Sequence, residues 1–247
     1  MSCPTYDAAE HRSQTREAYD RLAEVWSKTT DDGPYNGGLE RPALRSLVPL
    51  SVAGQTVLDA GCGSGAQCAW LLDQGADVVG IDLSPRMVDE AVRRCGGRGQ
   101  FLVADLAEPL PVEPRSFYGI TCSLALHYLA DWRMPLRSFA MALRPGGWAV
   151  ISLDHPSGPP LPDQQGGYLD TELVSDTWRK DDVEVTQRFW RRPLAAVVDA
   201  FADAGFVIDR VAEARPDADA LLRWPDDLAA AAVMPSFIVY RLLLRGP

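Results

Sequence analysis

Three aspartates, each placed at the end of an apolar run, are the residues of this chain with the clearest chemical potential. Asp59 precedes a glycine turn over residues 61–65, and Asp82 and Asp105 end the next two apolar runs. A glycine turn after a buried parallel strand brings backbone N–H groups close to a bound nucleotide, usually to its phosphates. A fixed carboxylate at the same strand end repels a pyrophosphate and attracts positive charge. The pattern therefore indicates a nucleoside ligand that carries positive charge.

Asp82 and Asp105 extend this candidate site to the neighbouring strands. In a doubly wound sheet, an acidic side chain at the tip of the second strand accepts hydrogen bonds from the hydroxyls of a ribose. Asp82 has that position, and Asp105 is placed to accept a hydrogen bond from an adenine amino group. A single aspartate after a strand is more often a turn former or a helix cap. Three of them with a glycine turn favour one ligand-binding crevice.

Two of the three histidines are candidates for a general base. His127 follows the fourth apolar run and His155 follows the fifth, and histidine titrates near neutral pH. We predict His127 as the first choice and His155 as the second, with Asp154 placed to orient either imidazole. His11 is predicted to be solvent-exposed and uninvolved.

Aromatic residues gather in the N-terminal region and in the long segment after His155. They either wall an apolar pocket for an aromatic substrate or serve as packing anchors, and both interpretations are open at this point. The candidates for the substrate wall are Trp26, Tyr35, Tyr128, Tyr168 and Trp178, and the same long segment holds Phe189 and Trp190. Arg191 and Arg192 either bind an acidic group of the substrate or form the solvated start of a helix.

The elements that position these residues follow from the hydrophobic periodicity. Residues 8–28 are predicted to form an amphipathic helix. Buried parallel strands are predicted at the short apolar runs 56–60, 77–82, 100–104, 117–124 and 147–153. Ser84-Pro85 is a typical helix start and Gly96-Gly97 a typical stop. After a long loop we expect a helix over 194–204 and two closing strands at 206–211 and 237–244. This pattern predicts an α/β fold with a doubly wound sheet and helices on both faces.

Composition narrows the classes of partner and compartment. The chain has 247 residues, 47% of them hydrophobic, which is enough for a substantial core, and its net charge of −10 argues against a nucleic-acid partner. Five scattered cysteines, Cys3 among them, show neither metal-ligand nor redox-pair spacing, so we predict reduced thiols and no metal site. A signal-like apolar run is missing near the start, and no segment reaches the roughly 20 apolar residues of a membrane helix. We therefore expect a cytoplasmic monomer or homodimer that binds a small molecule and no membrane.

Five stretches of the chain resemble the class I S-adenosylmethionine-dependent methyltransferases, in particular the small-molecule branch of ubiquinone, menaquinone and natural-product enzymes. The stretches are VLDAGCGSG (57–65), GIDLSPRMVDEA (80–91), VADL (103–106), SLALHYL (123–129) and LRPGGWAVIS (143–152). The resemblance implies a seven-stranded sheet of order 3-2-1-4-5-7-6 with strand 7 antiparallel. It also implies S-adenosylmethionine as cofactor and S-adenosylhomocysteine as product.

The same resemblance implies which residues contact the cofactor. The glycine turn with Asp59 would hold the methionine end, Met87 would pack on adenine, and Ser123 would offer backbone near the amino acid. Tyr19 resembles a lid contact, although ordinary packing of a helix face is an equal alternative. The full set of expected cofactor contacts is Tyr19, Asp59, Gly61, Cys62, Gly63, Asp82, Leu83, Met87, Ala104, Asp105, Leu106 and Ser123.

These observations predict one methyltransferase domain over residues 1–247. Its expected parts are an N-terminal helical lid (1–50), a cofactor-binding core (51–154), a substrate-side insertion (155–192) and a C-terminal helix with closing strands (193–247). The methyl acceptor is expected to be an O, N or C atom of a small aromatic or apolar metabolite. Two alternatives stay open: an NAD(P)-dependent oxidoreductase, because the glycine turn also fits a loose dinucleotide pattern, and a non-catalytic S-adenosylmethionine-binding or scaffold protein.

Overall fold

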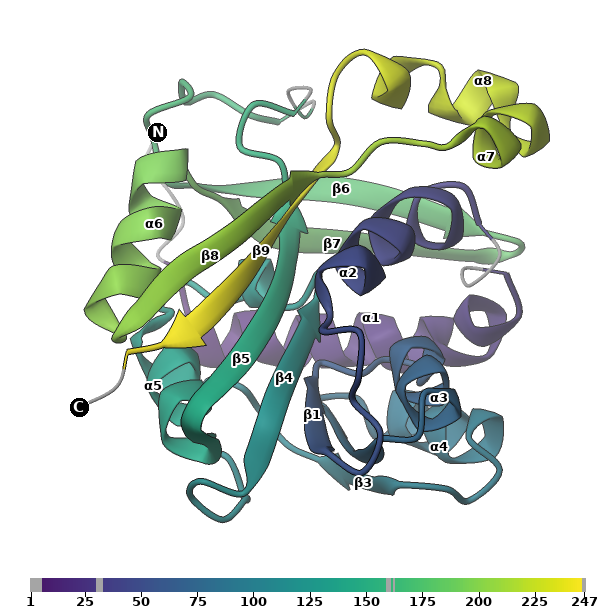
Figure 1. The fold of residues 1–247 in the computed structure, drawn as a ribbon. Helices are drawn as coiled ribbons and strands as arrows, with labels where there is room; N and C mark the ends of the chain where they lie inside the picture. Colours follow the sequence, from purple (N-terminus) through teal and green to yellow (C-terminus); the bar gives the residue numbers. More distant parts are fainter. Residues whose placement is uncertain (1–5, 30–32, 159–160, 162, 246–247) are drawn as a thin grey trace.

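The computed structural model describes residues 6–29, 33–158, 161 and 163–245. Within these residues the chain forms a seven-stranded sheet, a separate two-stranded sheet and helices on both faces of the larger sheet (Figure 1). The fold class predicted from the sequence is therefore confirmed. Cys3 lies outside the described residues, and the other four cysteines are buried free thiols, in agreement with the prediction.

The large sheet has the order β3-β2-β1-β4-β5-β9-β8. Strands β1 to β5 pair in parallel, whereas β9 is antiparallel to both of its neighbours. Since β8 and β9 are the sixth and seventh predicted strands, this is the expected order with its antiparallel strand 7. The strands are β1 (Thr56–Ala60), β2 (Asp77–Asp82), β3 (Gln100–Val103), β4 (Phe117–Ser123), β5 (Leu143–Asp154), β8 (Phe206–Glu213) and β9 (Phe237–Leu244).

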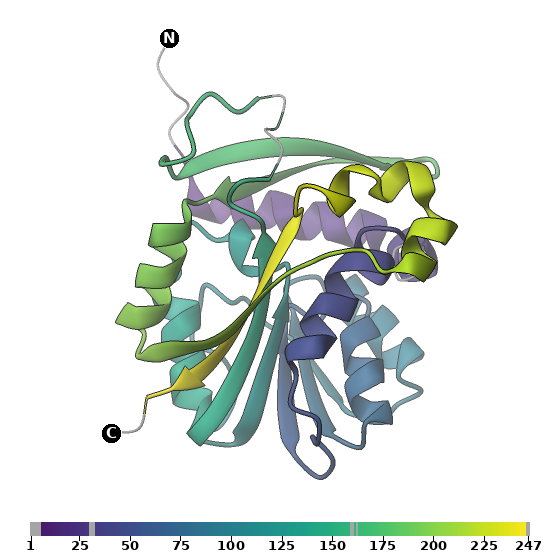
Figure 2. The ribbon, with the colours of Figure 1, turned by 45° about the horizontal axis from the view of Figure 1, so that its top comes forward.

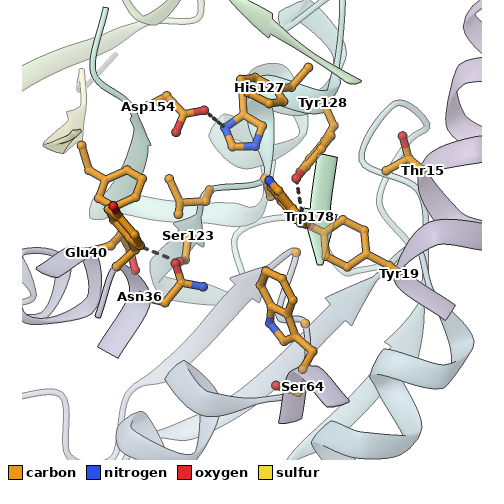
Figure 3. Close-up of a pocket in the computed structure, with 18 of the residues that line it drawn as sticks. Thr15, Tyr19, Asn36, Glu40, Ser64, Ser123, His127, Tyr128, Asp154 and Trp178 are labelled. Carbon is orange, nitrogen blue, oxygen red and sulfur yellow. Dashed lines mark hydrogen bonds and ion pairs between the residues drawn. The ribbon is translucent and has the colours of Figure 1, made fainter. Parts of the chain in front are cut away.

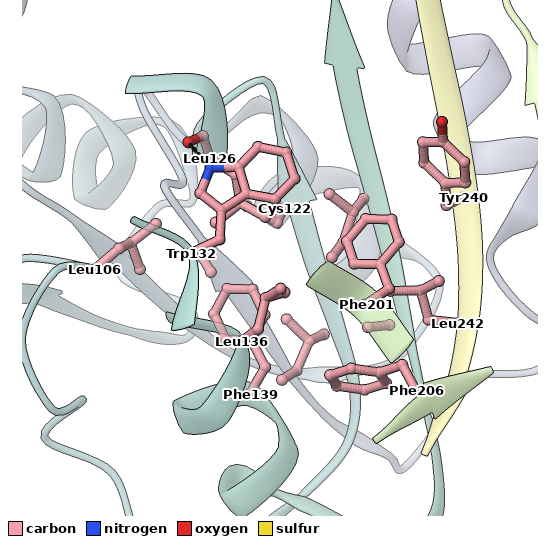
Figure 4. Packing of buried hydrophobic residues seen from close by; sticks show 14 of the residues in the cluster. Leu106, Cys122, Leu126, Trp132, Leu136, Phe139, Phe201, Phe206, Tyr240 and Leu242 are labelled. Carbon is pink, nitrogen blue, oxygen red and sulfur yellow. Dashed lines mark hydrogen bonds between the residues drawn. The ribbon is translucent and has the colours of Figure 1, made fainter. Parts of the chain in front are cut away.

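Two hydrophobic layers attach helices to the two faces of this sheet. The helices are α2 (Arg41–Leu47), α3 (Ala66–Asp73) and α4 (Pro85–Arg94) on one face, and α5 (Arg133–Ala142) and α6 (Leu194–Asp203) on the other. Phe139 of α5 and Phe201 of α6 are fully buried against β4, β5 and β9 (Figure 4). Because successive strand residues face opposite sides, Val150 joins one layer and Ile151 the other.

Local signals fix the helix that follows β2. Ser84 accepts a hydrogen bond from the Met87 backbone N–H at 3.1 Å, and Pro85 occupies the first turn of α4. The helix ends just before Gly96 and Gly97, which both have positive φ. The start and stop predicted from the sequence are therefore confirmed, and the cap sets the backbone directly after Asp82.

Two elements cover the carboxyl ends of the central strands. Helix α1 (Ala8–Thr29) runs across them and contacts α4 on one side and a β-hairpin on the other (Figure 2). The hairpin consists of β6 (Glu172–Lys180) and β7 (Val183–Arg191), which pair in antiparallel fashion. The sequence predicts a long loop over residues 155–192, and this is wrong where the hairpin forms. Residues 159, 160 and 162 of this segment lie outside the described part. The hairpin forms because Val185 and Phe189 bury one of its faces.

The remaining elements are short helical turns before α2, after β4 and between β8 and β9. A π-helical turn, η1 (Asn36–Glu40), leads into α2, and a 3₁₀ turn, η2 (Leu126–Tyr128), follows β4. Between β8 and β9 lie α7 (Ala218–Arg223), α8 (Pro225–Leu228) and η3 (Ala230–Ala232). In the described part of the chain, every helix is too short or too polar to span a bilayer.

Candidate active site

A cavity of about 910 Å³ lies at the carboxyl ends of β1, β2, β4 and β5, and residues of α1 and of the β6–β7 hairpin also line it. In doubly wound sheets this crevice is where ligands bind. It collects almost all of the residues that the sequence singled out. Those that line it are Tyr19, Trp26, Tyr35, Asp59, Gly61, Cys62, Gly63, Asp82, Leu83, Ala104, Asp105, Leu106, Ser123, His127, Tyr128, His155 and Trp178.

Met87 and Tyr168 do not line this cavity. Met87 is fully buried with Ala18 and Leu22 of α1, because the lid helix packs directly over α4. Tyr168 is half exposed, and its hydroxyl lies at the start of α6. The geometry therefore does not support the adenine contact predicted for Met87 or the substrate contact predicted for Tyr168.

The turn after β1 lets the chain approach its neighbours too closely for any side chain. Gly61 has φ +77°, and a Cβ atom there would lie 2.4 Å from the Cβ of Ala125. Gly65 has φ +82°, and its Cβ would lie 2.8 Å from the Cα of Ala91. Only glycine fits both positions. The result is a tight backbone turn beside the cavity, as expected for a close approach to a nucleoside ligand.

Asp59 lies at the floor of the cavity and is almost completely buried. Its carboxylate accepts hydrogen bonds from the Thr121 hydroxyl at 2.7 Å and the Cys68 thiol at 3.1 Å. Burial raises the pKa of Asp59, and these two donors act in the opposite direction. The side chain is thus a fixed acidic group held by one residue of the neighbouring strand β4 and one of helix α3.

Asp82 joins the glycine turn to the start of α4. One carboxylate oxygen accepts from the Gly63 N–H at 2.8 Å and the other from the Ser84 N–H at 2.9 Å. Each oxygen retains a lone pair for a further donor, which suits the two adjacent hydroxyls of a ribose. Burial raises the pKa of Asp82 to about 6. This site therefore fits the adenosyl part of the predicted cofactor.

Asp105 is engaged by the lid helix. Arg12 of α1 lies 2.9 Å from one carboxylate oxygen, and the other oxygen accepts from the Ala107 N–H at 2.8 Å. The sequence placed Asp105 correctly at the third strand end but gave no sign of Arg12. The adenine contact stays a prediction, and a donor there would share the carboxylate with a guanidinium.

His127 and Asp154 face each other at the opposite end of the cavity (Figure 3). His127 Nδ1 lies 3.1 Å from Asp154 Oδ2, an ion-pair distance, although the alignment is not that of a hydrogen bond. The imidazole is buried and rests between the rings of Tyr128 and Phe189, with centroid distances of 4.4 and 5.2 Å. A carboxylate at Nδ1 orients the ring and leaves Nε2 as the basic nitrogen.

His155 is held by its neighbours at the edge of the cavity. Its Nδ1 accepts from the Ser157 backbone N–H at 3.2 Å, and its Nε2 lies 3.3 Å from Glu213. Both ring nitrogens therefore have partners, which disfavours His155 as the base. His11 was predicted to be exposed, and this was wrong: it is buried, and its Nε2 bonds the carbonyl of Tyr128 at 3.0 Å.

Aromatic rings form one wall of the cavity, between Asp82 at one end and the His127–Asp154 pair at the other. The hydroxyls of Tyr19 and Tyr128 share a hydrogen bond of 2.7 Å, and burial raises the pKa of both. The indoles of Trp26 and Trp178 stack at a centroid distance of 5.5 Å. Tyr35 lies at the more exposed rim. These rings create an apolar compartment next to His127.

Arg191 and Arg192 are not a solvated helix start, so that alternative is wrong. Both are half-buried before α6. Arg191 lines the cavity and donates to the carbonyl of Gly158 at 3.0 Å, whereas Arg192 lies 4.4 Å from the ring centroid of Trp132.

Glu40 is a cavity residue that the sequence did not reveal. It ends η1, is 1% exposed, and accepts hydrogen bonds from the hydroxyls of Ser123, at 3.0 Å, and Ser152. Burial raises its pKa, and the nearby Arg41 opposes that effect. No periodic pattern surrounds Glu40, and its two partners are more than 80 residues away. Only the tertiary structure brings them together.

The strand order and the acidic crevice at the strand ends define a doubly wound α/β protein built to hold a nucleoside cofactor. A family model described as a methyltransferase domain matches residues 58–151. The chain is 31% identical to a demethylmenaquinone methyltransferase of Beutenbergia cavernae over 87% of this chain and 78% of that protein. It is 34% identical to one of Clavibacter sepedonicus over 66% of each chain. A solved S-adenosylmethionine-dependent methyltransferase of Mesorhizobium loti superimposes with a TM-score of 0.67 at 28% identity, covering 85% of this chain and all of that one. The chain belongs to the class I S-adenosylmethionine-dependent methyltransferases.

Membership in this family argues against one of the alternatives that the sequence left open, the NAD(P)-dependent oxidoreductase. The family's cofactor is S-adenosylmethionine, so the oxidoreductase interpretation of the glycine turn is not supported. The first curated relatives are matched only in part, because the chain spans between 49% and 66% of their lengths. The identity of the methyl acceptor therefore has to be inferred from the geometry of the site.

Proposed function

We propose that this chain transfers a methyl group from S-adenosylmethionine to a hydroxyl group of a small aromatic or apolar metabolite. The observation that carries the proposal is the His127–Asp154 pair beside an aromatic compartment. The names of the matched relatives support the small-molecule class, since four of them are demethylmenaquinone methyltransferases and another is a ubiquinone biosynthesis O-methyltransferase of Xanthomonas euvesicatoria.

The donor supplies an electrophilic methyl group on a sulfonium, and the protein has to align an acceptor with it. Alignment of nucleophile, methyl carbon and sulfur is an effect worth several orders of magnitude in rate. The stacked Trp26 and Trp178 and the paired Tyr19 and Tyr128 offer flat apolar surfaces for an aromatic acceptor. The same rings exclude water from the compartment, which favours a reaction in which charge is dispersed.

A hydroxyl group is a poor nucleophile until its proton is removed. His127 is placed to take that proton at Nε2, because Asp154 holds its other nitrogen and stabilises the imidazolium that results. A neutral amine or an electron-rich carbon has less need of such a base. The presence of an oriented, buried histidine therefore favours O-methylation over the other two outcomes.

Methylation assays with matched acceptors test this proposal. Purified protein is incubated with S-adenosylmethionine that carries a labelled methyl group, and with pairs of phenols or hydroxyquinones and their amino analogues. We expect label in ethers of the hydroxyl compounds. In His127→Ala, kcat falls about 100-fold or more, the usual contribution of a general base, while calorimetry shows unchanged affinity for S-adenosylhomocysteine.

His155→Ala is the matched control and retains most of the turnover, because both nitrogens of His155 are already engaged. Methylation of the amines alone, or full activity in His127→Ala, would contradict the proposal. Tight binding of S-adenosylhomocysteine with no methylated product would support the non-catalytic alternative instead.

A further inference from the structure

Glu40 is among the residues that line the cavity, and one of its carboxylate oxygens is buried without a hydrogen-bond partner in the described part of the chain. Its Oε1 accepts the hydroxyl hydrogens of Ser123, at the end of β4, and Ser152, on β5. Its Oε2 is buried and has no hydrogen-bond partner within the described part of the chain. The side chain nevertheless lines the cavity (Figure 3). A buried carboxylate oxygen without a donor is costly, so this position calls for a donor from a ligand.

The contacts that Glu40 makes with β4 and β5 use only Oε1. Ser152 accepts a hydrogen bond from the Leu124 N–H at 3.1 Å, so its own hydroxyl hydrogen goes to Glu40. This chain of contacts holds Leu124 at φ +47°, an unfavourable conformation for leucine, and so shapes the turn that leads to His127. Every contact in it uses Oε1. The role of Oε2 is therefore separate from that of Oε1.

The order of the strands indicates which part of the donor reaches Oε2. The ribose site at Asp82 lies at the end of β2, and Asp105 follows β3 on the side away from β1. Glu40 is bonded to β4 and β5, on the opposite side. Neighbouring strands lie about 4.8 Å apart, so β4 is roughly 10 Å from β2. A donor with its adenosine over β2 and β3 thus extends its methionine end over β1 towards Glu40.

The methionine end carries an ammonium and a carboxylate, and the wall offers groups of opposite charge to both. Glu40 is followed directly by Arg41, which is also buried and also lines the cavity. A carboxylate accepts from an ammonium in a short, charge-assisted hydrogen bond, and a guanidinium is the matching group for a carboxylate. The two consecutive residues thus match a free amino acid in its zwitterionic form.

We propose that Glu40 Oε2 accepts a hydrogen bond from the α-ammonium of the donor and so makes Glu40 a specificity-determining residue for adenosyl ligands that carry an amino acid. The inference rests on the proposed function only in taking S-adenosylmethionine as the donor. It needs no knowledge of the acceptor.

Calorimetry with three product-like ligands tests the contact without any turnover. The ligands are S-adenosylhomocysteine, its desamino analogue S-adenosyl-4-thiobutyrate, which keeps the carboxylate, and 5′-methylthioadenosine, which lacks the whole amino acid. We expect the wild type to bind S-adenosylhomocysteine about 30-fold or more tightly than the desamino analogue, the usual size of a buried charge contact. In Glu40→Gln this preference shrinks to less than about threefold, while the affinity for 5′-methylthioadenosine is unchanged.

Ser152→Ala is the matched control, because it removes one donor to Oε1 and leaves Oε2 in place. It should keep the preference for the ammonium. Equal binding of S-adenosylhomocysteine and its desamino analogue by the wild type would overturn the inference, and this arm needs no variant that folds. An equal loss for all three ligands in Glu40→Gln would also overturn it, since that is the signature of a structural role.

Failure of the proposed function has a different signature. Wild-type protein that binds S-adenosylhomocysteine with the ammonium preference, yet methylates no hydroxyl compound, would refute the proposed reaction and leave the role of Glu40 intact. Protein that ignores all three ligands would overturn both proposals.

Discussion

The affinity for the cofactor should depend on pH through Asp82. Burial raises the pKa of this carboxyl to about 6 in the ligand-free protein. In the proposed complex the ribose hydroxyls donate to its oxygens, so ligand binding would favour the ionised form and lower the pKa again. With a free-state pKa of about 6, Asp82 is about 90% ionised at pH 7 and about 10% ionised at pH 5. The affinity for S-adenosylhomocysteine should therefore fall about tenfold between these pH values.

Calorimetry on the wild type and Asp82→Asn isolates this effect. The variant should bind about 10- to 100-fold more weakly at pH 7.5, since it loses a charge-assisted hydrogen bond, and should show a smaller pH dependence. Histidines that titrate in the same range contribute equally to both proteins, so the difference between the two curves belongs to Asp82. Identical pH dependence in the wild type and the variant would refute the reasoning.

The raised pKa of Asp82 also makes the stability of the ligand-free protein depend on pH. The direction is opposite to that of the affinity, because the stability falls as the pH rises. The pKa of Asp82 is higher in the folded state than its ordinary value of 3.8, so the folded state holds the proton more tightly than the unfolded state. Its contribution to stability is therefore present below pH 3.8 and is lost as the pH rises to about 6. The shift of about 2 pKa units corresponds to about 3 kcal/mol. Denaturant unfolding without ligand, compared between wild type and Asp82→Asn, would reveal this decrease.

Two further predictions concern stability. Tyr19→Phe removes the buried hydroxyl bond to Tyr128 and should lower the free energy of unfolding by about 1–3 kcal/mol; in the double variant with Tyr128→Phe the two losses should not add, and full additivity in a denaturant-based cycle would count against the contact. Phe139→Ala empties a fully buried position of α5 and should cost about 3–5 kcal/mol, whereas Met141→Ala on the exposed side of the same helix should change stability by less than about 0.5 kcal/mol. Equal effects of these last two substitutions would show that the α5 packing is not as described.

The central sheet was predictable because its signals are local. Strands β1, β2, β4 and β5 read as short apolar runs, since central parallel strands are buried on both faces. The edge strand β3 is more exposed, but it is also an apolar run in the sequence. The cap at Ser84 and the glycines after α4 mark the helix ends without any knowledge of distant residues. Three acidic side chains at successive strand ends then follow from the parallel direction alone, because parallel strands end at the same edge.

The hairpin and the lid contacts were not predictable in the same way. Strand β6 buries only Val174, and β7 alternates buried with more exposed residues. Both strands form because of tertiary packing, which includes contacts with α1, rather than because of local propensity. The ion pair between Arg12 and Asp105 joins residues far apart in sequence. Glu40 is the clearest case, since nothing near it in the chain distinguishes it from a solvated glutamate. Long-range partners thus explain most of what the sequence missed.

Helix α1 contacts both ends of the cavity and so connects the donor side with the acceptor side. On the donor side Arg12 reaches Asp105, and on the acceptor side Tyr19 bonds Tyr128. One rigid helix that makes both contacts cannot move away from one end without disturbing the other. If the adenosine binds at Asp82 and Asp105 as proposed, the same helix covers the donor and borders the apolar compartment beside His127, where methyl transfer needs water to be excluded. In the proposed complex, α1 therefore connects the cofactor site with the acceptor pocket.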